Sequence, residues 1–275
     1  IRDYAPKAWV INYTNPMSLC VKTLYHVFPE IKAFGCCHEV FGTQKLLAQI
    51  AERELGLTNI AREDIVVNVL GLNHFTWFDR ASYKGIDLFP VYRHFIETHF
   101  EEGFEEKDNN WMNSTFACAH RVKFDLFQKY GWIAAAGDRH LAEFMPPIYL
   151  KDPQTVASWK FGLTTVTWRK EDLKKRLEKS KRLVSGEEQV ELNPSGEEGI
   201  LLIKALCGLT RVISNVNIPN TAGQIPNLPK SAVVETNAVF SRDSIAPVYA
   251  GNLTEEIRQL MLPHVMNHEE YLTCQ

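Results

Sequence analysis

Two short polar segments carry residue types that commonly bind metal ions. They are Gly35-Cys36-Cys37-His38-Glu39 and Gly71-Leu72-Asn73-His74, and each follows an apolar, β-rich run. Such runs form buried strands, so each polar segment is expected at the carboxyl end of a strand. A thiolate and an imidazole from two such ends could bind one metal ion, which would act as a Lewis acid on a hydroxyl group. A cysteine that packs as a small hydrophobic side chain is the alternative.

The elements that position these segments follow the order strand, helix, strand, helix. Apolar spacing predicts strands at 10–13 and 31–36 and helices at 17–27 and 42–55. This order is typical of the final part of a parallel, doubly wound α/β sheet. Two antiparallel strands, at 65–70 and 75–82, are expected to extend the same sheet.

The next part of the chain is predicted to be mainly helical. The predicted helices lie at 91–101, 116–130, 169–181 and 199–209. Between the first two, residues 100–113 are rich in acidic residues and Asn, and we expect a surface loop that covers the site.

The composition describes a globular chain with a large core. Of its 275 residues, 45% are hydrophobic and 23% are charged, which excludes a disordered or low-complexity protein. The net charge of -3 provides no basic field for nucleic acid. No apolar stretch reaches the length of about 18 residues that a membrane span needs. The six cysteines are scattered, which favours reduced thiols and a cytoplasmic location.

Two further segments complete a set of four motifs. They are Asn12-Tyr13-Thr14-Asn15-Pro16 and, far downstream, Asn220-Thr221-Ala222-Gly223-Gln224-Ile225-Pro226-Asn227-Leu228-Pro229. In this order, and across nearly the whole chain, the four motifs resemble those of glycoside hydrolase family 4, the NAD- and metal-dependent glycosidases.

The resemblance implies two domains of an α/β protein. Residues 1–64 would be the C-terminal part of a Rossmann-like domain, as in lactate and malate dehydrogenases. Residues 65–275 would be an α+β domain that binds substrate and metal. No G-x-G-x-x-G follows a strand, so the Gly-rich N-terminal half of the NAD domain is absent from this sequence and is expected to precede Ile1.

The resemblance also implies roles for individual residues. Cys37 and His74 match the two metal ligands of the family, normally to manganese. His38 matches the position that usually acts as general acid, a role that suits an imidazole. Val40 completes a Cys-His-Glu-Val signature, which we associate with the branch of the family that cleaves uronides.

Asparagine residues are expected to hold the substrate and the cofactor. Asn15 resembles the residue that lies between nicotinamide and sugar, with Asn12 as its companion and Asn73 beside the metal ligand. Asn220 is expected in the substrate pocket. The alternative for Asn15 is an Asn that forms a turn before proline, and the alternative for Asn220 is a tight loop.

The segment that begins at Gly137 lies where the family carries the base that removes a proton from the sugar ring. Asp138 is the predicted base, with Tyr130 as the alternative. Arg139 could pair with a substrate carboxylate in bidentate fashion, or it could be a surface arginine. His140 is expected to help hold the sugar or the metal.

The implied reaction is a redox-assisted elimination, which makes these enzymes an exception among glycosidases. NAD takes hydride from C3 of the sugar, the metal polarises the resulting ketone, and the base removes the proton from C2. The leaving group then departs from C1, water adds, and hydride returns to C3.

The predicted activity is that of an α-galacturonidase on short oligosaccharides, by a homo-oligomer of two or four chains. An α-glucosidase or α-galactosidase of the same family is the nearest alternative. A lactate- or malate-type dehydrogenase, which shares the topology and a similar Asn-Pro turn, comes from another class. So does an inactive fragment.

Overall fold

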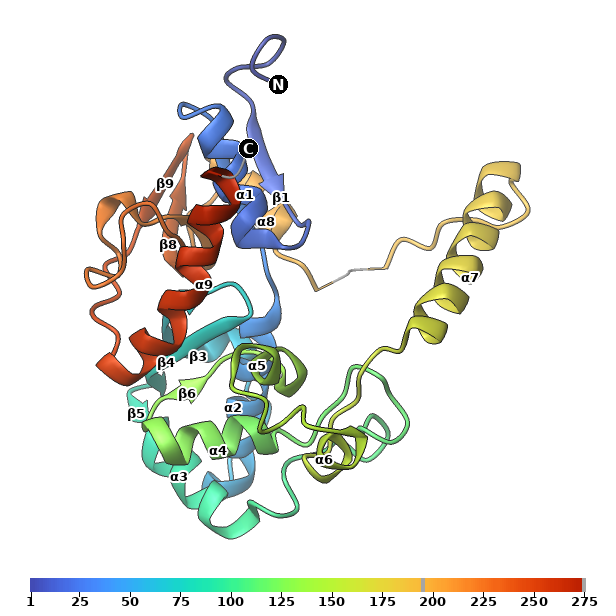
Figure 1. The fold of residues 1–275 in the computed structure, drawn as a ribbon, viewed down its shortest axis with the longest axis vertical. Coiled ribbons are helices and arrows are strands. Elements are labelled where there is room, and N and C mark those ends of the chain that lie inside the picture. The colour runs from blue at the N-terminus through green and yellow to red at the C-terminus, as the bar shows by residue number, and fades with distance from the viewer. Residues whose placement is uncertain (194–195, 274–275) are drawn as a thin grey trace.

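Two β-sheets organise the chain, and most of the helices pack around them (Figure 1). The structure is a computed structural model that describes residues 1–193 and 196–273. The strands are β1 (Trp9–Asn12), β2 (Lys32–Gly35), β3 (Ile65–Leu72), β4 (Phe75–Tyr83), β5 (Ile86–Asp87), β6 (Ile133–Ala134), β7 (Val212–Pro219), β8 (Val233–Ser241) and β9 (Ser244–Pro247). The α-helices are α1 (Met17–Val27), α2 (Glu39–Leu55), α3 (Leu88–His99), α4 (Arg121–Tyr130), α5 (Asp138–Phe144), α6 (Pro153–Ser158), α7 (Val166–Ser185), α8 (Gly199–Leu206) and α9 (Glu255–Thr273). Two short 3₁₀ helices are η1 (Arg62–Asp64) and η2 (Asn220–Ala222).

The first sheet has the order β1-β2-β7-β8-β9, and its first two strands are parallel. Helix α1 connects them, as the apolar spacing predicts, and α2 follows β2. Helix α2 ends at Gly56, whose φ of 65° is the left-handed conformation that glycine adopts at no steric cost. The predicted Rossmann-like α/β arrangement is confirmed.

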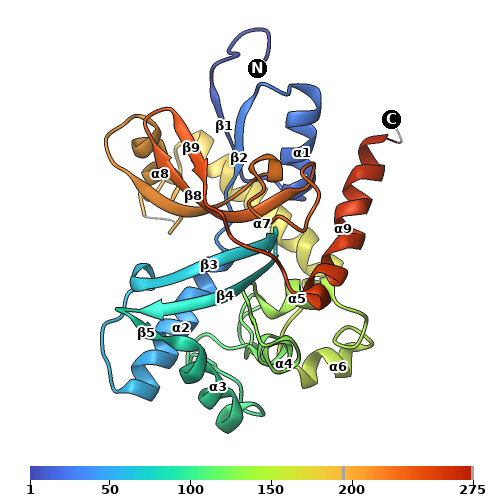
Figure 2. The same cartoon turned by 90° about the vertical axis from the view of Figure 1, so that its left-hand side faces the viewer.

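The prediction that residues 65–82 extend this sheet is wrong. They form the hairpin β3-β4 of a second sheet (Figure 2). This sheet has four strands, because β5 and β6 both pair with β4. The edge of β2 is occupied instead by β7, which meets it antiparallel at Gly35 and Asn217. The first sheet therefore takes strands from both sides of the domain boundary expected at residue 64, and the division into two domains stays a prediction.

Both faces of the second sheet are buried, and this holds its hairpin turn in place. Trp77 and Phe78 point to opposite faces of β4, and neither is exposed. Trp77 packs in a cluster with residues of α5 and α9, whereas Phe78 packs with α2 and α3. Full burial of one such side chain stabilises the fold by about 1.5–3 kcal/mol. The turn that carries Asn73 and His74 is thus fixed by a core on each side.

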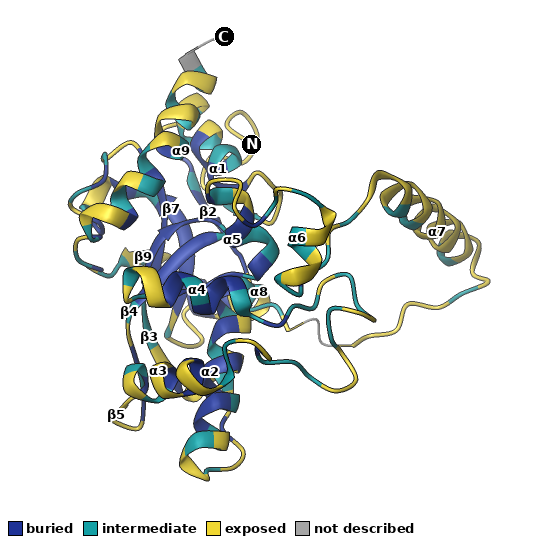
Figure 3. Cartoon of the chain, turned by 60° about the horizontal axis from the view of Figure 1, so that its bottom comes forward, coloured by how far each residue is buried: buried dark blue, intermediate teal, exposed yellow. Residues whose placement is uncertain are grey.

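Helix α4 is shorter than predicted, and helix α7 is solvated. Helix α4 begins at Arg121 rather than at residue 116, because His120 has a φ of 60° and Cys118 pairs with Phe161 in an isolated β-bridge. Helix α7 projects from the body of the molecule, and none of its residues is buried (Figures 1 and 3). In the part of the chain that the structure describes, no helix is long and apolar enough to cross a membrane.

Candidate active site

One carboxylate and two imidazoles converge where α2, α5 and the β3-β4 turn meet. A ligand atom from each of Glu39, His74 and His140 lies within 4.8 Å of the other two. The two imidazole rings stack with their centroids 4.2 Å apart, and Nε2 of His140 lies 3.7 Å from Oε1 of Glu39. His74 has a φ of 63°, which turns the chain between β3 and β4 and directs the ring toward His140. Nitrogen and oxygen donors in such an arrangement suit a divalent metal ion.

The charges in this cluster also favour a cation. Burial lowers the pKa of His74 to about 4, and the neighbouring His140 adds to the effect, so the His74 ring is neutral and keeps a lone pair near pH 7. Burial alone would raise the pKa of Glu39, but His140 and a hydrogen bond from the backbone N–H of Gly137, 2.8 Å long, keep it below its usual value. Glu39 therefore carries its charge. Reasoning from the sequence missed Glu39 as a site residue, although it stands directly after His38 in the signature.

Cys37 lies next to this cluster but not in it. Burial, and then the carboxylate of Glu235, raise the pKa of its thiol well above the usual value. The backbone of Glu39 and the side chain of Asn73 act in the opposite direction and lower this pKa. Among the residues that the structure describes, no group of three potential metal ligands includes Cys37. Its pairing with His74 on one metal ion stays a prediction.

A buried amide network lies behind Cys37. Asn73 donates to Oε2 of Glu235 over 3.2 Å. Asn215 donates to Oε1 of Glu235 over 2.7 Å and to the backbone oxygen of Cys37 over 3.2 Å. In this structure the amide of Asn73 donates to Glu235, and Asn73 thereby supports the turn that carries His74. Its predicted contact with substrate stays a prediction. Glu235 is a second residue that sequence reasoning missed, because only the fold brings β8 to this place.

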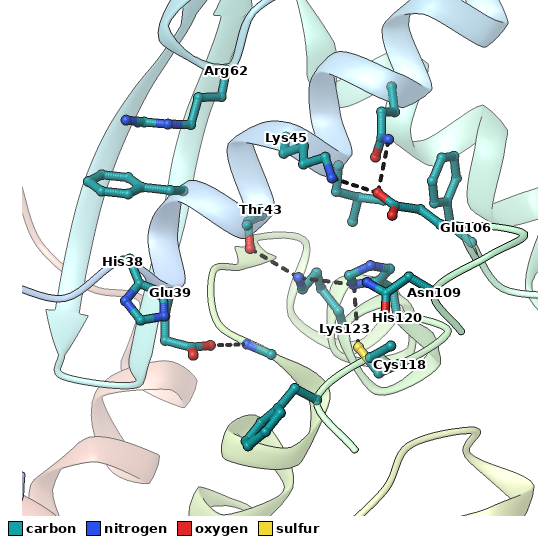
Figure 4. Close-up of a pocket in the computed structure, with 18 of the residues that line it drawn as sticks. His38, Glu39, Thr43, Lys45, Arg62, Glu106, Asn109, Cys118, His120 and Lys123 are labelled. Carbon is teal, nitrogen blue, oxygen red and sulfur yellow. Dashed lines mark hydrogen bonds and ion pairs between the residues drawn. The ribbon is translucent and has the colours of Figure 1, made fainter. Parts of the chain in front are cut away.

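His38 lies at the boundary of two cavities. Its Nδ1 is 2.8 Å from Oε1 of Glu197, and its side chain is exposed. A cavity of about 460 Å³ on one side is lined by α2, by residues 104–109 and by Lys123 (Figure 4). A smaller cavity of about 250 Å³ on the other side is lined by Arg139 and His140. The predicted loop at 100–113 does contribute to the wall of the larger cavity.

Arg139 offers an unused hydrogen-bond donor in the smaller cavity. Its guanidinium stacks on the ring of Phe116, with 4.9 Å between the guanidinium carbon and the ring centroid. Its Nη1 is buried, and no hydrogen-bond acceptor for it exists among the described residues. A buried guanidinium nitrogen without an acceptor is costly, so the cavity is suited to an anion.

The two residues predicted as the base lie elsewhere. Asp138 is fully buried, and its two oxygens accept the backbone N–H groups of Val122 and Lys123 at 3.1 and 3.2 Å, in the first turn of α4. Burial raises its pKa to about 6. Tyr130 ends α4, and its ring packs edge-on against Trp77 in the core. The structure brings neither side chain into the group of Glu39, His74 and His140, and the identity of the base stays a prediction.

The Asn12–Pro16 turn lies beside the Cys37 segment, because β1 and β2 are parallel neighbours. The backbone N–H of Cys36 donates to the oxygen of Asn12 over 3.0 Å. The side chain of Asn12 bonds both the N–H and the oxygen of Thr14, and Asn15 accepts from the N–H of Met17 over 3.2 Å. Both Asn residues thus shape the turn, and Asn15 is exposed beyond the end of β1.

Asn220 points into its own loop, and its predicted contact with substrate stays a prediction. The residue is fully buried, and its amide nitrogen donates to the backbone oxygens of Ile225, Leu228 and Pro229 at 2.9 to 3.2 Å. Its side-chain oxygen accepts from the N–H of Ile225 over 3.0 Å. The amide therefore holds the 220–229 loop together and has no donor left for a ligand.

Comparison with known proteins identifies relatives along nearly all of the chain. The sequence model described as family 4 glycosyl hydrolase matches residues 1–53, and that of the family 4 glycosyl hydrolase C-terminal domain matches residues 69–273. A protein of Lachnoclostridium phytofermentans named alpha-galacturonidase is 73% identical over 270 residues, which are 98% of this chain and 58% of the relative. The chain therefore spans less than two thirds of that relative.

Two solved structures show the same fold. The crystal structure of lplD from Bacillus subtilis has a TM-score of 0.92 and 52% identity, and the match covers 98% of this chain and 61% of that one. A 6-phospho-alpha-glucosidase from gut microorganisms, in complex with NAD and Mn²⁺, has a TM-score of 0.70 and 19% identity over 98% of this chain and 59% of that one. At 19% identity this second likeness concerns the fold alone.

Proposed function

Since the chain belongs to the family 4 glycosyl hydrolases, we propose that it is part of an enzyme that releases α-linked galacturonic acid from short oligosaccharides. The observation that carries the proposal is the 73% identity, over 98% of the chain, to a protein named alpha-galacturonidase. Because the chain belongs to this family, we no longer consider a lactate- or malate-type dehydrogenase. An α-glucosidase or α-galactosidase remains the alternative that the experiment below tests.

The donor set fits a divalent metal such as manganese. Glu39 carries a charge, and His74 is neutral and half-buried, so both can donate a lone pair without first losing a proton. Burial makes a thiolate at Cys37 unfavourable unless a cation lies beside it, and a coordinating metal ion supplies that charge. We propose that His74 and Cys37, together with Glu39 and His140, would hold the ion.

The end of β1 fits the position of NAD. In open α/β sheets ligands bind outside the carboxyl ends of the parallel strands, where Asn15 and the Cys37 segment lie here. A family 4 structure of the same fold holds NAD and Mn²⁺. When bound, these groups would accept a hydride and polarise a sugar hydroxyl. The residues that carry the Gly-rich turn would come from the part of the protein outside this sequence.

The side chains of this sequence supply binding and proton transfer. Arg139 binds the carboxylate of the galacturonate, because its buried Nη1 needs an acceptor and a carboxylate is a charged acceptor that a neutral sugar lacks. His38 donates a proton to the departing oxygen. Glu197 accepts a hydrogen bond from Nδ1 of that ring, which leaves Nε2 to face the substrate. Phe116 stacks on Arg139 and keeps the guanidinium in one orientation.

Hydrolysis of aryl glycosides tests this proposal. Protein that includes the N-terminal region is given NAD and manganese under reducing conditions, with 4-nitrophenyl α-D-galacturonide, α-D-galactoside or α-D-glucoside as substrate. We expect release that needs both cofactors and favours the uronide. Cleavage of the neutral sugars alone would refute the uronide assignment, and cleavage of none would refute the glycosidase itself.

The setting of the enzyme is part of the proposal. Five free cysteines lie among the described residues, which suits a reducing, cytoplasmic location. The whole protein is proposed to be a dimer or tetramer, and light scattering of the purified protein measures this directly.

A further inference from the structure

The larger cavity beside His38 contains a buried ammonium group that the proposed function does not use. This group is Nζ of Lys123, and it projects from α4 into the cavity of about 460 Å³ (Figure 4). The side chain crosses from α4 toward α2, and the whole residue is only 1% exposed. A charged group at such depth is costly unless it is paired.

The contacts of Lys123 with other described residues do not include an ion pair. Its Nζ donates to Oγ1 of Thr43 over 3.0 Å and lies 3.3 Å from Nδ1 of His120. Burial, and then the charge of Lys123, lower the pKa of His120 well below the usual value, so its neutral ring accepts the bond. Across residues 1–193 and 196–273, no carboxylate lies within ion-pair distance of this Nζ. Asp138 and Glu39 are nearby acids, but the oxygens of Asp138 accept backbone N–H groups of α4, and Glu39 accepts the backbone N–H of Gly137.

Other cations that line the same cavity already have partners. Lys45 pairs with Glu106 over 2.6 Å, and Arg62 pairs with Glu198 over 3.0 Å. These pairs are partly exposed, and the side chain of Lys45 is 60% exposed. Lys123 therefore differs from them in two respects, its depth and its neutral partners. An anion that enters this cavity would find its best partner at Lys123.

The two cavities lie on either side of His38, the proposed proton donor. They share the lining residues His38, Glu39, Phe116, Ala117, Cys118 and Gly137. A glycosidic bond held beside His38 thus has one sugar toward Arg139 and the other toward Lys123. The volume of the larger cavity falls within the range of about 300–1,000 Å³ that is usual for small-molecule sites.

We propose that the cavity of about 460 Å³ binds the leaving-group sugar, and that Lys123 binds a carboxylate on that sugar. Lys123 is then a residue that determines specificity, because it favours a substrate that is acidic on both sides of the bond that is cleaved. This inference rests on the proposed function, because it places the leaving group relative to Arg139 and His38.

Two disaccharides test the inference with the unmodified protein. One contains two α-linked galacturonates, and in the other galactose replaces the galacturonate at the reducing end. Release of galacturonic acid is measured with the whole protein, NAD and manganese. We expect kcat/KM to be at least tenfold higher for the first disaccharide, a ratio that corresponds to about 1.4 kcal/mol. Equal values for the two disaccharides would overturn the inference.

Variants of α4 and α2 test whether Lys123 causes the preference for the disaccharide of two galacturonates. Lys123→Met should bring the ratio of the two kcat/KM values close to one, because it removes the charge and keeps the length of the side chain. Lys129→Met is the matched control, since Lys129 lies on the same helix and pairs with Asp125 over 2.6 Å. It should leave the ratio unchanged. Thr43→Val keeps the charge but removes the hydroxyl that orients it, and should lower the ratio at least threefold.

The outcomes separate this inference from the proposed function. If both Lys123→Met and Thr43→Val still prefer the disaccharide of two galacturonates, the role of Lys123 is overturned. If Lys123→Met does not fold, the result for Thr43→Val alone decides whether Lys123 has this role. If neither disaccharide nor the aryl galacturonide is cleaved, the proposed function itself fails. Cleavage of the aryl galacturonide, combined with no preference between the disaccharides, refutes only the leaving-group site.

Discussion

Replacing Arg139 by methionine should convert a uronide-selective site into an unselective one. The substitution removes a guanidinium whose buried Nη1 has no acceptor among the described residues and which stacks on Phe116, and it keeps most of the apolar stem. A hydrogen bond to a charged group contributes about 1.5–3 kcal/mol. The expected loss in kcat/KM for 4-nitrophenyl α-D-galacturonide is therefore about 10- to 150-fold.

The neutral substrate and two further variants make this measurement selective. The α-D-galactoside has no carboxylate, so its kcat/KM should change less than about twofold on the same substitution. Arg139→Lys keeps the charge but loses the planar fork and the stacking on Phe116, so it should give an intermediate loss. Arg80→Met, at a side chain that is 73% exposed on β4, is the control. Equal losses for both substrates, or none for either, would refute the assignment of Arg139.

Three further predictions concern other residues. His38→Ala should lower kcat about 100-fold for a sugar leaving group but less than tenfold for 4-nitrophenolate, which needs little protonation, and steady-state kinetics with both substrates checks this. Glu39→Gln should weaken Mn²⁺ binding at least tenfold in a calorimetric titration, because it removes the charged donor beside His74; unchanged affinity would exclude Glu39 as a ligand. Burial lowers the pKa of His264, so the unfolded chain binds the proton more readily and the free energy of unfolding falls as the pH drops below about 6.5. In urea unfolding at pH 7.5 and 5, His264→Gln should reduce this decrease in the free energy of unfolding, and the control His26→Gln, at an exposed position, should not. Equal decreases in the unmodified protein and both variants would contradict the reasoning.

The early elements of the fold could be predicted because their signals are local. Helix α1 has the predicted limits, since Pro16 precedes it and its apolar residues recur at helical spacing up to Val27. The end of α2 follows from Gly56, which alone decides where the helix stops. Which strand lies next to β2 could not be read in this way. Strand β7 comes from residues more than 170 positions later, and nothing in the intervening sequence encodes that neighbour.

The candidate site shows the same limit. Its chemical residue types were visible in the sequence, and the fold does bring His74 and His140 together. The structural role of Asn220 could not be read from the sequence, because a buried Asn that closes a loop and an Asn that binds a sugar look alike there. Glu235 and Lys123 were missed because a buried charge is recognised only when its surroundings are known.

The most direct test of the account is the hydrolysis of an α-galacturonide in D₂O by the whole protein with NAD and manganese, followed by NMR of the released galacturonic acid. If the proton on C2 of the sugar is removed during each turnover, the product carries deuterium at C2, and omission of NAD abolishes both label and product. Release of galacturonic acid without deuterium at C2, or in the absence of NAD, would contradict the account.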